Sequence, residues 1–92
     1  MGRVLGLDVG DRRIGIAVSD ETQLIATPHS VYTRVGYGPD CRHIARLYGE
    51  LGCVGVVSGL PLNMDGSAGF QAEKVRAFAA KLEEAGLPVA FQ

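Results

Sequence analysis

The chain has 92 residues, of which 47% are hydrophobic and 21% charged, and its formal net charge is −1. This length predicts one small domain spanning residues 1–92, and the near-neutral charge excludes a strongly basic nucleic-acid binder. No apolar run approaches the roughly 20 residues of a membrane span, and the N-terminus lacks the order of a secretory signal. We therefore expect a cytoplasmic protein that does not associate with membranes.

The chain begins with two predicted strands joined by a tight turn. Residues 4–9 put three large apolar side chains on one face and Asp8 on the other. Residues 14–19 alternate in the same way, with only Gly, Ala and Ser on the second face. In the turn, residues 10–13, Gly10 is available for a positive φ angle. The pattern predicts a hairpin with one apolar face and one face of small residues that carries Asp8.

A third strand and a helix are predicted next. The strand covers residues 23–34, where Pro28 indicates a sheet edge or a bulge rather than a central pairing position. Pro39 suits the first residue of a helix, and Asp40 favours its positive N-terminal end. Apolar residues then recur at helical spacing until Gly52, which is the expected stop.

The second half of the chain alternates between strand and helix. Residues 54–58 predict a buried parallel strand, followed by a loop over 59–67, a helix over 67–85 and a last strand over 89–91. The fold class is therefore α/β, with a mixed five-stranded sheet: three antiparallel strands followed by two parallel crossovers. Helices are expected to flank the sheet, with one sheet face short of a cover.

The position of Asp8 is unusual, because aspartate is depleted in strands. Three roles are open to it: a hydrogen-bonded turn, a metal ligand, or a general acid or base. Asp20 follows the second strand and is expected at the opposite end of the hairpin. Asp65 lies in a loop at the carboxyl end of a parallel strand, where ligands bind in open α/β sheets, but Asp65-Gly66 is also ordinary turn chemistry.

Two roles are open to the positively charged residues of the first half of the chain. The cations of the first half are all arginines, whose planar fork suits phosphate contacts, although pairing with nearby acids explains them equally well. Those arginines are Arg3, Arg12, Arg13, Arg34, Arg42 and Arg46. Cys41 and Cys53 are expected as free, partly buried thiols rather than a disulfide, because the chain has no secretory signal. A metal site at Cys41 and His43 is disfavoured, because a structural zinc site needs four ligands.

The stretch from Leu5 to Asp20 and the loop from Gly59 to Ser67 together closely resemble the YqgF/RuvX family. These bacterial proteins have a ribonuclease H-like fold and are described as Holliday-junction resolvases and as pre-16S rRNA nucleases. The first motif alone also resembles the phosphate-binding hairpin of actin-like ATPases and sugar kinases. The two motifs in this order make the resemblance specific.

The resemblance implies a nuclease that depends on Mg²⁺ or Mn²⁺ and cleaves phosphodiesters of pre-rRNA or branched DNA. By this resemblance Asp8 is a catalytic metal ligand. Arg12 and Arg13 would bind substrate near its phosphate backbone, although bracing the turn is a second role open to Arg13. Asn63 and Ser67 belong to a second motif expected to contact substrate.

The chain also departs from the family pattern. Members usually continue after the fifth strand with an Asp-Glu-Arg motif, a further helix and a late aspartate. We therefore expect the C-terminal helix and the second and third active-site carboxylates to be missing here, and little or no nuclease activity from this chain alone. Two alternatives remain: a nucleotide-phosphate binder related to the actin-like ATPases, and a non-catalytic module that forms a homodimer.

Overall fold

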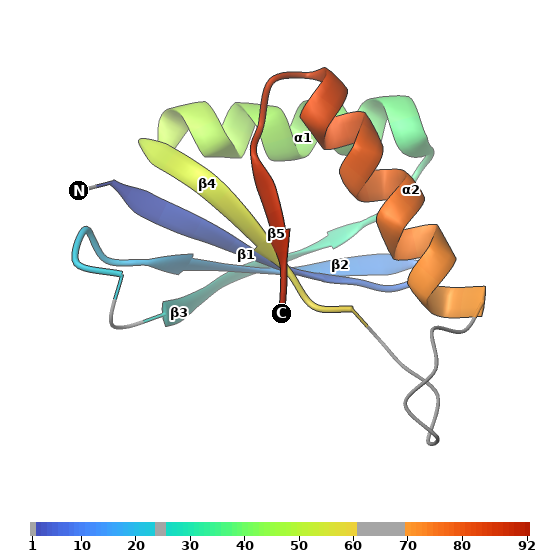
Figure 1. Cartoon of the computed structure of the whole chain (residues 1–92), viewed down its shortest axis with the longest axis horizontal. Helices are drawn as coiled ribbons and strands as arrows, with labels where there is room; N and C mark the ends of the chain where they lie inside the picture. The colour runs from blue at the N-terminus through green and yellow to red at the C-terminus, as the bar shows by residue number, and fades with distance from the viewer. Residues whose placement is uncertain (1, 24–25, 61–69) are drawn as a thin grey trace.

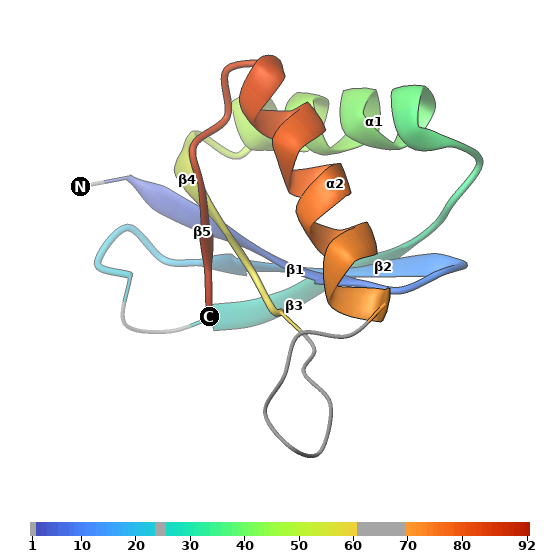
Figure 2. The same ribbon diagram turned by 45° about the vertical axis from the view of Figure 1, so that its right-hand side comes forward.

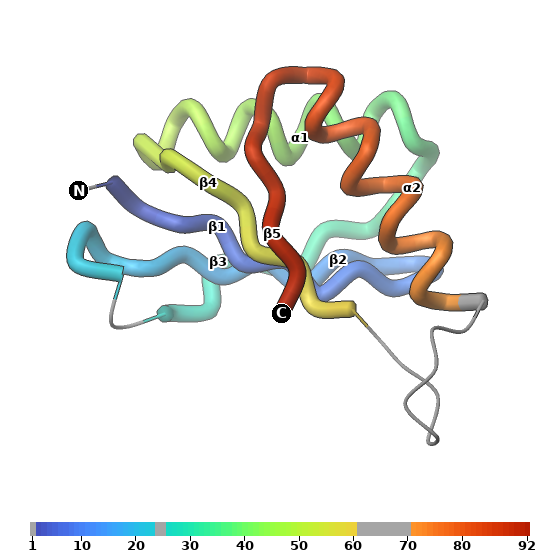
Figure 3. Tube along the Cα trace, viewed as in Figure 1, coloured from blue at the N-terminus to red at the C-terminus, as the bar shows by residue number. Residues whose placement is uncertain are grey.

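The computed structural model describes residues 2–23, 26–60 and 70–92, and the predicted order of strands and helices is confirmed (Figures 1 and 3). The elements are β1 (Arg3–Val9), β2 (Arg13–Ser19), β3 (Ala26–Thr33), α1 (Tyr37–Glu50), β4 (Cys53–Ser58), α2 (Phe70–Glu84) and β5 (Val89–Phe91). The third strand ends at Thr33, one residue earlier than predicted, and Gln23 is not part of it. Residues 24–25 of the predicted third strand and 67–69 of the predicted second helix lie outside the described residues.

The five strands form one mixed sheet in the order β3-β2-β1-β4-β5. β1 pairs antiparallel with β2 and parallel with β4, and β4 pairs parallel with β5. β1 is therefore the central strand. Its carboxyl end lies beside that of β4, because parallel neighbours run in the same direction.

Both helices cover the same face of the sheet (Figures 1 and 2). Large apolar side chains from the sheet and from both helices pack together on that face and are almost completely buried. They include Leu5 of β1, Ile14 of β2, Ile44 of α1, Val56 of β4 and Phe78 of α2. The expectation of helices on the sheet is confirmed, but the described helices lie on one side only. The opposite face, which carries Asp8, is uncovered in the described part of the chain, as the sequence predicted.

The edge position of β3 follows from its sequence. Pro28 has no N–H to donate to a neighbouring strand, and β3 pairs with β2 alone. The register shifts where Ile16 faces Ser30 but the next residue, Ala17, faces Pro28, so His29 is the extra residue of a bulge. Both roles predicted for Pro28 are thus confirmed.

Two local predictions are wrong. Helix α1 begins at Tyr37 rather than at Pro39, because the Asp40 N–H donates to the Gly36 carbonyl at 2.9 Å and closes the turn earlier. Gly10 does not adopt a positive φ. Glycine suits this position for another reason, since an added Cβ would lie only 3.0 Å from the Arg13 carbonyl oxygen, a tight contact.

The end of α1 and the cysteines agree with the sequence. Gly52 has a φ of 67° just after α1, a conformation that favours glycine and ends helices. Cys41 and Cys53 are free and buried, and burial raises the pKa of both thiols. Neither described helix is long and apolar enough to cross a membrane.

Candidate functional site

Asp8 lies one residue before the carboxyl end of the central strand β1, with its side chain on the uncovered face of the sheet. The neighbouring residues Leu7 and Val9 point to the core and are buried, whereas Asp8 is exposed. Its cross-strand partner is Gly15, and a Cβ added there would lie 3.5 Å from the Asp8 Cβ. The carboxylate therefore stands beside a strand position with no side chain.

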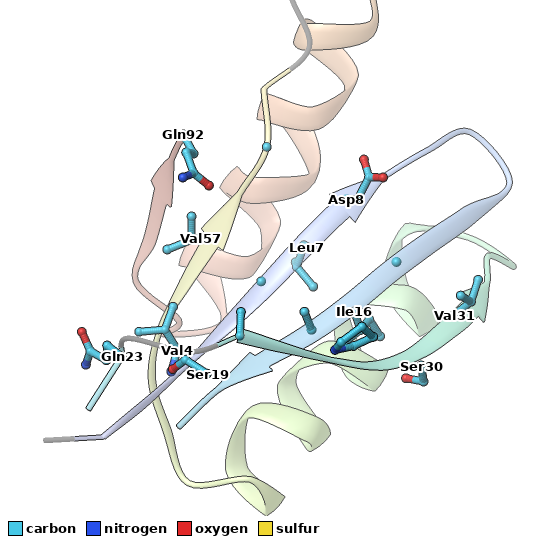
Figure 4. A pocket seen from close by; sticks show the side chains of 16 residues that line it. Val4, Leu7, Asp8, Ile16, Ser19, Gln23, Ser30, Val31, Val57 and Gln92 are labelled. Atoms are coloured by element: carbon cyan, nitrogen blue, oxygen red, sulfur yellow. The ribbon is translucent and has the colours of Figure 1, made fainter. Parts of the chain in front are cut away.

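Two hollows meet at Asp8. The larger extends along the uncovered face, and Figure 4 shows Asp8 at one end of it and Ser19 and Gln23 at the other. The smaller lies at the carboxyl ends of β1 and β4 and is lined by Asp8, Gly59 and Gln71 among others. Since ligands of open α/β sheets bind beyond the carboxyl ends of strands, Asp8 occupies the position expected of a ligand-binding carboxylate.

The two hairpin arginines take different positions. Arg13 begins β2, two residues before Gly15, so the strand pleat puts it on the same face as Asp8. Diagonal neighbours of this kind have Cα atoms about 7 to 8 Å apart, within reach of a long side chain. Arg12 lies in the turn, and both side chains are exposed. Of the two, Arg13 is placed to share a ligand with Asp8.

A third arginine, Arg34, is fixed inside the protein. Its Nε donates to the Asp40 carboxylate at 2.9 Å and its Nη1 donates to the Gly10 carbonyl at 2.8 Å. The guanidinium also lies 5.4 Å from the ring centroid of Tyr37 and 5.2 Å from that of Phe78. Its side chain is only 14% exposed. The sequence left two roles open for the arginines, phosphate contact or pairing with a nearby acid, and Arg34 takes the second.

Asp40 is completely buried and has several hydrogen-bond donors. Besides Arg34, the backbone N–H groups of Val35 and Gly36 donate to it at 3.0 and 3.4 Å. Burial alone would raise the pKa of Asp40, but these hydrogen bonds hold that pKa below its ordinary value. The sequence indicated only a favourable place near a helix N-terminus and missed this ion pair. The available signal was an arginine six residues before an acid in a first helical turn.

The turn of the hairpin is also tied to α2. Lys74 Nζ lies 3.2 Å from Asp11 Oδ1, and Gln71 donates to the same oxygen at 3.4 Å. The hydrogen bond from Lys74 is the main reason why the pKa of Asp11 lies below its ordinary value. Contacts from α2 and from Arg34, at the end of β3, therefore converge on the turn that follows Asp8.

Of the remaining candidate residues, only Asp20 belongs to the described part of the chain, and it lies at the opposite end of the hairpin from Asp8. Asp20 lies beyond the far end of β2, where Thr22 donates to its carboxylate at 2.6 Å, in agreement with the sequence. Asn63, Asp65 and Ser67 lie outside the described residues. Within the described ranges, no three His, Cys, Asp or Glu side chains gather to hold a metal.

Asp8 and its described neighbours fit one divalent ion but not a pair of ions. Mg²⁺ commonly binds through one or two carboxylates and completes its shell with water and substrate phosphates, and an exposed carboxylate beside a hollow meets that need. A two-metal site requires further carboxylates, which the described residues do not supply at this position.

The architecture defines an α/β protein of the ribonuclease H-like class. Thermus thermophilus RuvC, solved in complex with a Holliday junction substrate, has a TM-score of 0.68 at 16% identity, covering 100% of this chain and 64% of that chain. A Bacteroides thetaiotaomicron protein with an actin-like ATPase fold has a TM-score of 0.63 at 11% identity, covering 99% and 32%. Similarity at these identities concerns the fold alone.

Sequence comparison is more specific. The family model described as "RuvX: Holliday junction resolvase" matches residues 2–92, and the chain belongs to this family. A Paracoccus denitrificans protein named "Putative pre-16S rRNA nuclease" is 43% identical over 91 residues, which cover 98% of this chain and 58% of the relative. A Rhodopseudomonas palustris protein of the same name is 45% identical over 78 residues, covering 85% and 49%. The chain thus spans about half the length of these relatives.

Proposed function

We propose that this protein is a metal-dependent nuclease, or the Asp8-bearing part of one, that hydrolyses phosphodiesters of structured nucleic acid. The observation that carries the proposal is the placement of Asp8: an exposed carboxylate near the end of the central strand, on an uncovered face, where two hollows meet. Membership of the RuvX family and the relatives named as pre-16S rRNA nucleases support it.

The residues take distinct roles in this proposal. Asp8 would hold Mg²⁺ or Mn²⁺, which when bound activates water and neutralises charge on the phosphate. Arg13, on the same face, would bind a phosphate oxygen with its planar fork, and Arg12 would contact the backbone from the turn. Asn63 and Ser67, from the second family motif, stay predicted substrate contacts.

The substrate would be either the 5′ end of pre-16S rRNA or a branched DNA such as a Holliday junction. Relatives carry the first name and the family description carries the second. Both substrates present a dense line of phosphates to an arginine-bearing hairpin. The predicted homodimer is a separate question, which the molar mass in solution decides.

The 92-residue chain should be a weak catalyst by itself. Among the described residues no group of three or more potential ligands includes Asp8, and one carboxylate holds Mg²⁺ loosely unless substrate phosphates complete the coordination. We therefore expect cleavage, if measurable, only at high protein and metal concentrations.

The test combines metal binding with cleavage. Mn²⁺ is titrated into the ¹⁵N-labelled chain, and paramagnetic broadening of amide signals around Asp8 is compared between wild type, Asp8→Asn and the control Asp20→Asn. Cleavage of a labelled pre-16S leader RNA and of a four-way DNA junction is followed in parallel. Of the two variants, we expect only Asp8→Asn to abolish the broadening and any metal-dependent cleavage. Broadening or cleavage that survives in Asp8→Asn would overturn the assignment.

A further inference from the structure

The side chain of Arg34 connects four separate parts of the molecule. It leaves the end of β3, donates from Nε to Asp40 in α1 and from Nη1 to the Gly10 carbonyl, and lies against the ring of Phe78 in α2. Its backbone N–H also donates to the Arg12 carbonyl at 2.8 Å. Thus one residue is hydrogen-bonded to both ends of the turn between β1 and β2.

This turn matters because it joins Asp8 to Arg13. Only four residues, 9–12, separate the two, and the Gly10 N–H donates to the Arg13 carbonyl at 2.8 Å. A two-strand ribbon ending in an unsupported turn frays at that end. The hydrogen bonds from Arg34 to Gly10 and Arg12 oppose that fraying, because the Arg34 side chain is itself held by Asp40 of α1 and lies against Phe78 of α2.

From these contacts we infer that Arg34 and its partner Asp40 are positioning residues that hold the β1–β2 turn and thereby set Asp8 against Arg13. The inference rests on the proposed function for its consequence, since the turn carries the groups expected to bind metal and phosphate. Arg34 itself lies on the helix-covered side of the sheet, with Tyr32 and Ile14. It lines neither of the two hollows at Asp8. It acts on the site only through the turn.

The geometry also explains why arginine is needed. The two side-chain hydrogen bonds leave from different nitrogens of one planar group, with Asp40 on one side and Gly10 on the other. Lysine has one nitrogen on a flexible stem and lacks this fixed fork. The Arg34→Lys variant keeps the positive charge beside Asp40 but cannot reproduce both contacts in the same plane.

The decisive experiment compares Arg34→Lys with Arg46→Lys. Arg46 forms an exposed pair with Glu50 at 3.7 Å in α1, so this variant makes the same chemical change away from the turn. Amide hydrogen exchange of Gly10 is measured in each variant, with the amide of Gly59, which donates to Leu7 at the β1–β4 junction, as the internal reference.

We expect Gly10 exchange to become about fivefold faster relative to Gly59 in Arg34→Lys, the factor for one lost hydrogen bond, and to stay unchanged in Arg46→Lys. Equal acceleration at both amides would mean that Arg34 only stabilises the whole fold, and no acceleration would mean that the turn does not depend on it. Either result would overturn the proposal.

Mn²⁺ broadening around Asp8 then separates this proposal from the proposed function. If the wild-type broadening depends on Asp8, we expect Arg34→Lys to require severalfold more Mn²⁺ for the same effect, and unchanged Mn²⁺ dependence would refute a positioning role. If it does not depend on Asp8, the proposed function fails, while the exchange comparison still decides whether Arg34 orders the turn.

Discussion

Replacing Asp40 by Asn removes the negative charge from the most deeply buried acid of the described residues. Asp40 accepts from the Arg34 guanidinium and from two backbone N–H groups, and it has no exposed surface. In the variant the Arg34 charge loses its partner, and the amide NH₂ of Asn turns a donor toward other donors. Removing one partner of a buried ion pair costs about 3–5 kcal/mol. Because the Arg34 side chain keeps 14% exposure, we expect a loss near the lower end, about 3 kcal/mol.

The assay is urea unfolding at pH 7, followed by far-ultraviolet circular dichroism, with Glu50→Gln as the matched control. That control removes the charge from the exposed Arg46–Glu50 pair, for which less than about 0.5 kcal/mol is expected. If the two variants lose the same small amount of stability, the Arg34–Asp40 pair behaves as a surface pair and the reasoning fails.

The dependence of this effect on pH supplies an internal check. The pKa of Asp40 in the folded protein lies below its ordinary value, so its charged form is favoured by folding. Its contribution is therefore fully present above the pKa of the unfolded chain, about 3.9, and is lost as pH falls through the lower folded pKa. The stability gap between wild type and Asp40→Asn should be constant between pH 5 and 7, to within about 0.5 kcal/mol, and should shrink below about pH 4. A gap that grew on acidification would contradict the assigned direction.

Three further predictions follow from burial and backbone geometry. Phe78→Ala removes a fully buried ring that also lies beside Arg34, so urea unfolding should show a loss of about 3–5 kcal/mol; a loss below about 1 kcal/mol would contradict the packing. Gly52→Ala forces a side chain into a φ of 67° and should cost about 1 kcal/mol, whereas a stabilised variant would show that this turn is misplaced. Cys41 and Cys53, buried thiols with raised pKa values, should react with a thiol reagent rapidly in denaturant and slowly without it; immediate reaction of the native protein would show that they are accessible.

The sequence predicted well those features that depend on local pattern. Alternation in β1 placed Asp8 opposite the core face, and Pro28 identified the edge strand and its bulge. These succeed because strand periodicity and the missing N–H of proline act within a few residues. The same reasoning found the helix stop at Gly52.

It failed where the outcome depends on contacts between distant elements. The hydrogen bond from Arg34 to the Gly10 carbonyl spans 24 residues, so no pattern close to either residue indicates this contact. The reason for glycine at position 10 was also wrong, since the close approach to the Arg13 carbonyl exists only once the hairpin is closed. For the candidate site, the sequence predicted the strand and the sheet face on which Asp8 lies, but not the Arg34–Asp40 ion pair beside the adjoining turn.

The strand order also separates the sheet into a local and a distant half. β1, β2 and β3 are consecutive in the sequence and pair as an antiparallel meander, whereas β4 and β5 join only after a helix has crossed the sheet. Contacts between residues close in sequence lose less chain entropy on closing and form early in folding. We therefore expect the meander to order first and the β1–β4 pairing to follow. Asp8 lies on β1, the strand shared by both halves. The smaller hollow, at the carboxyl ends of β1 and β4, is therefore completed only when β4 pairs with β1.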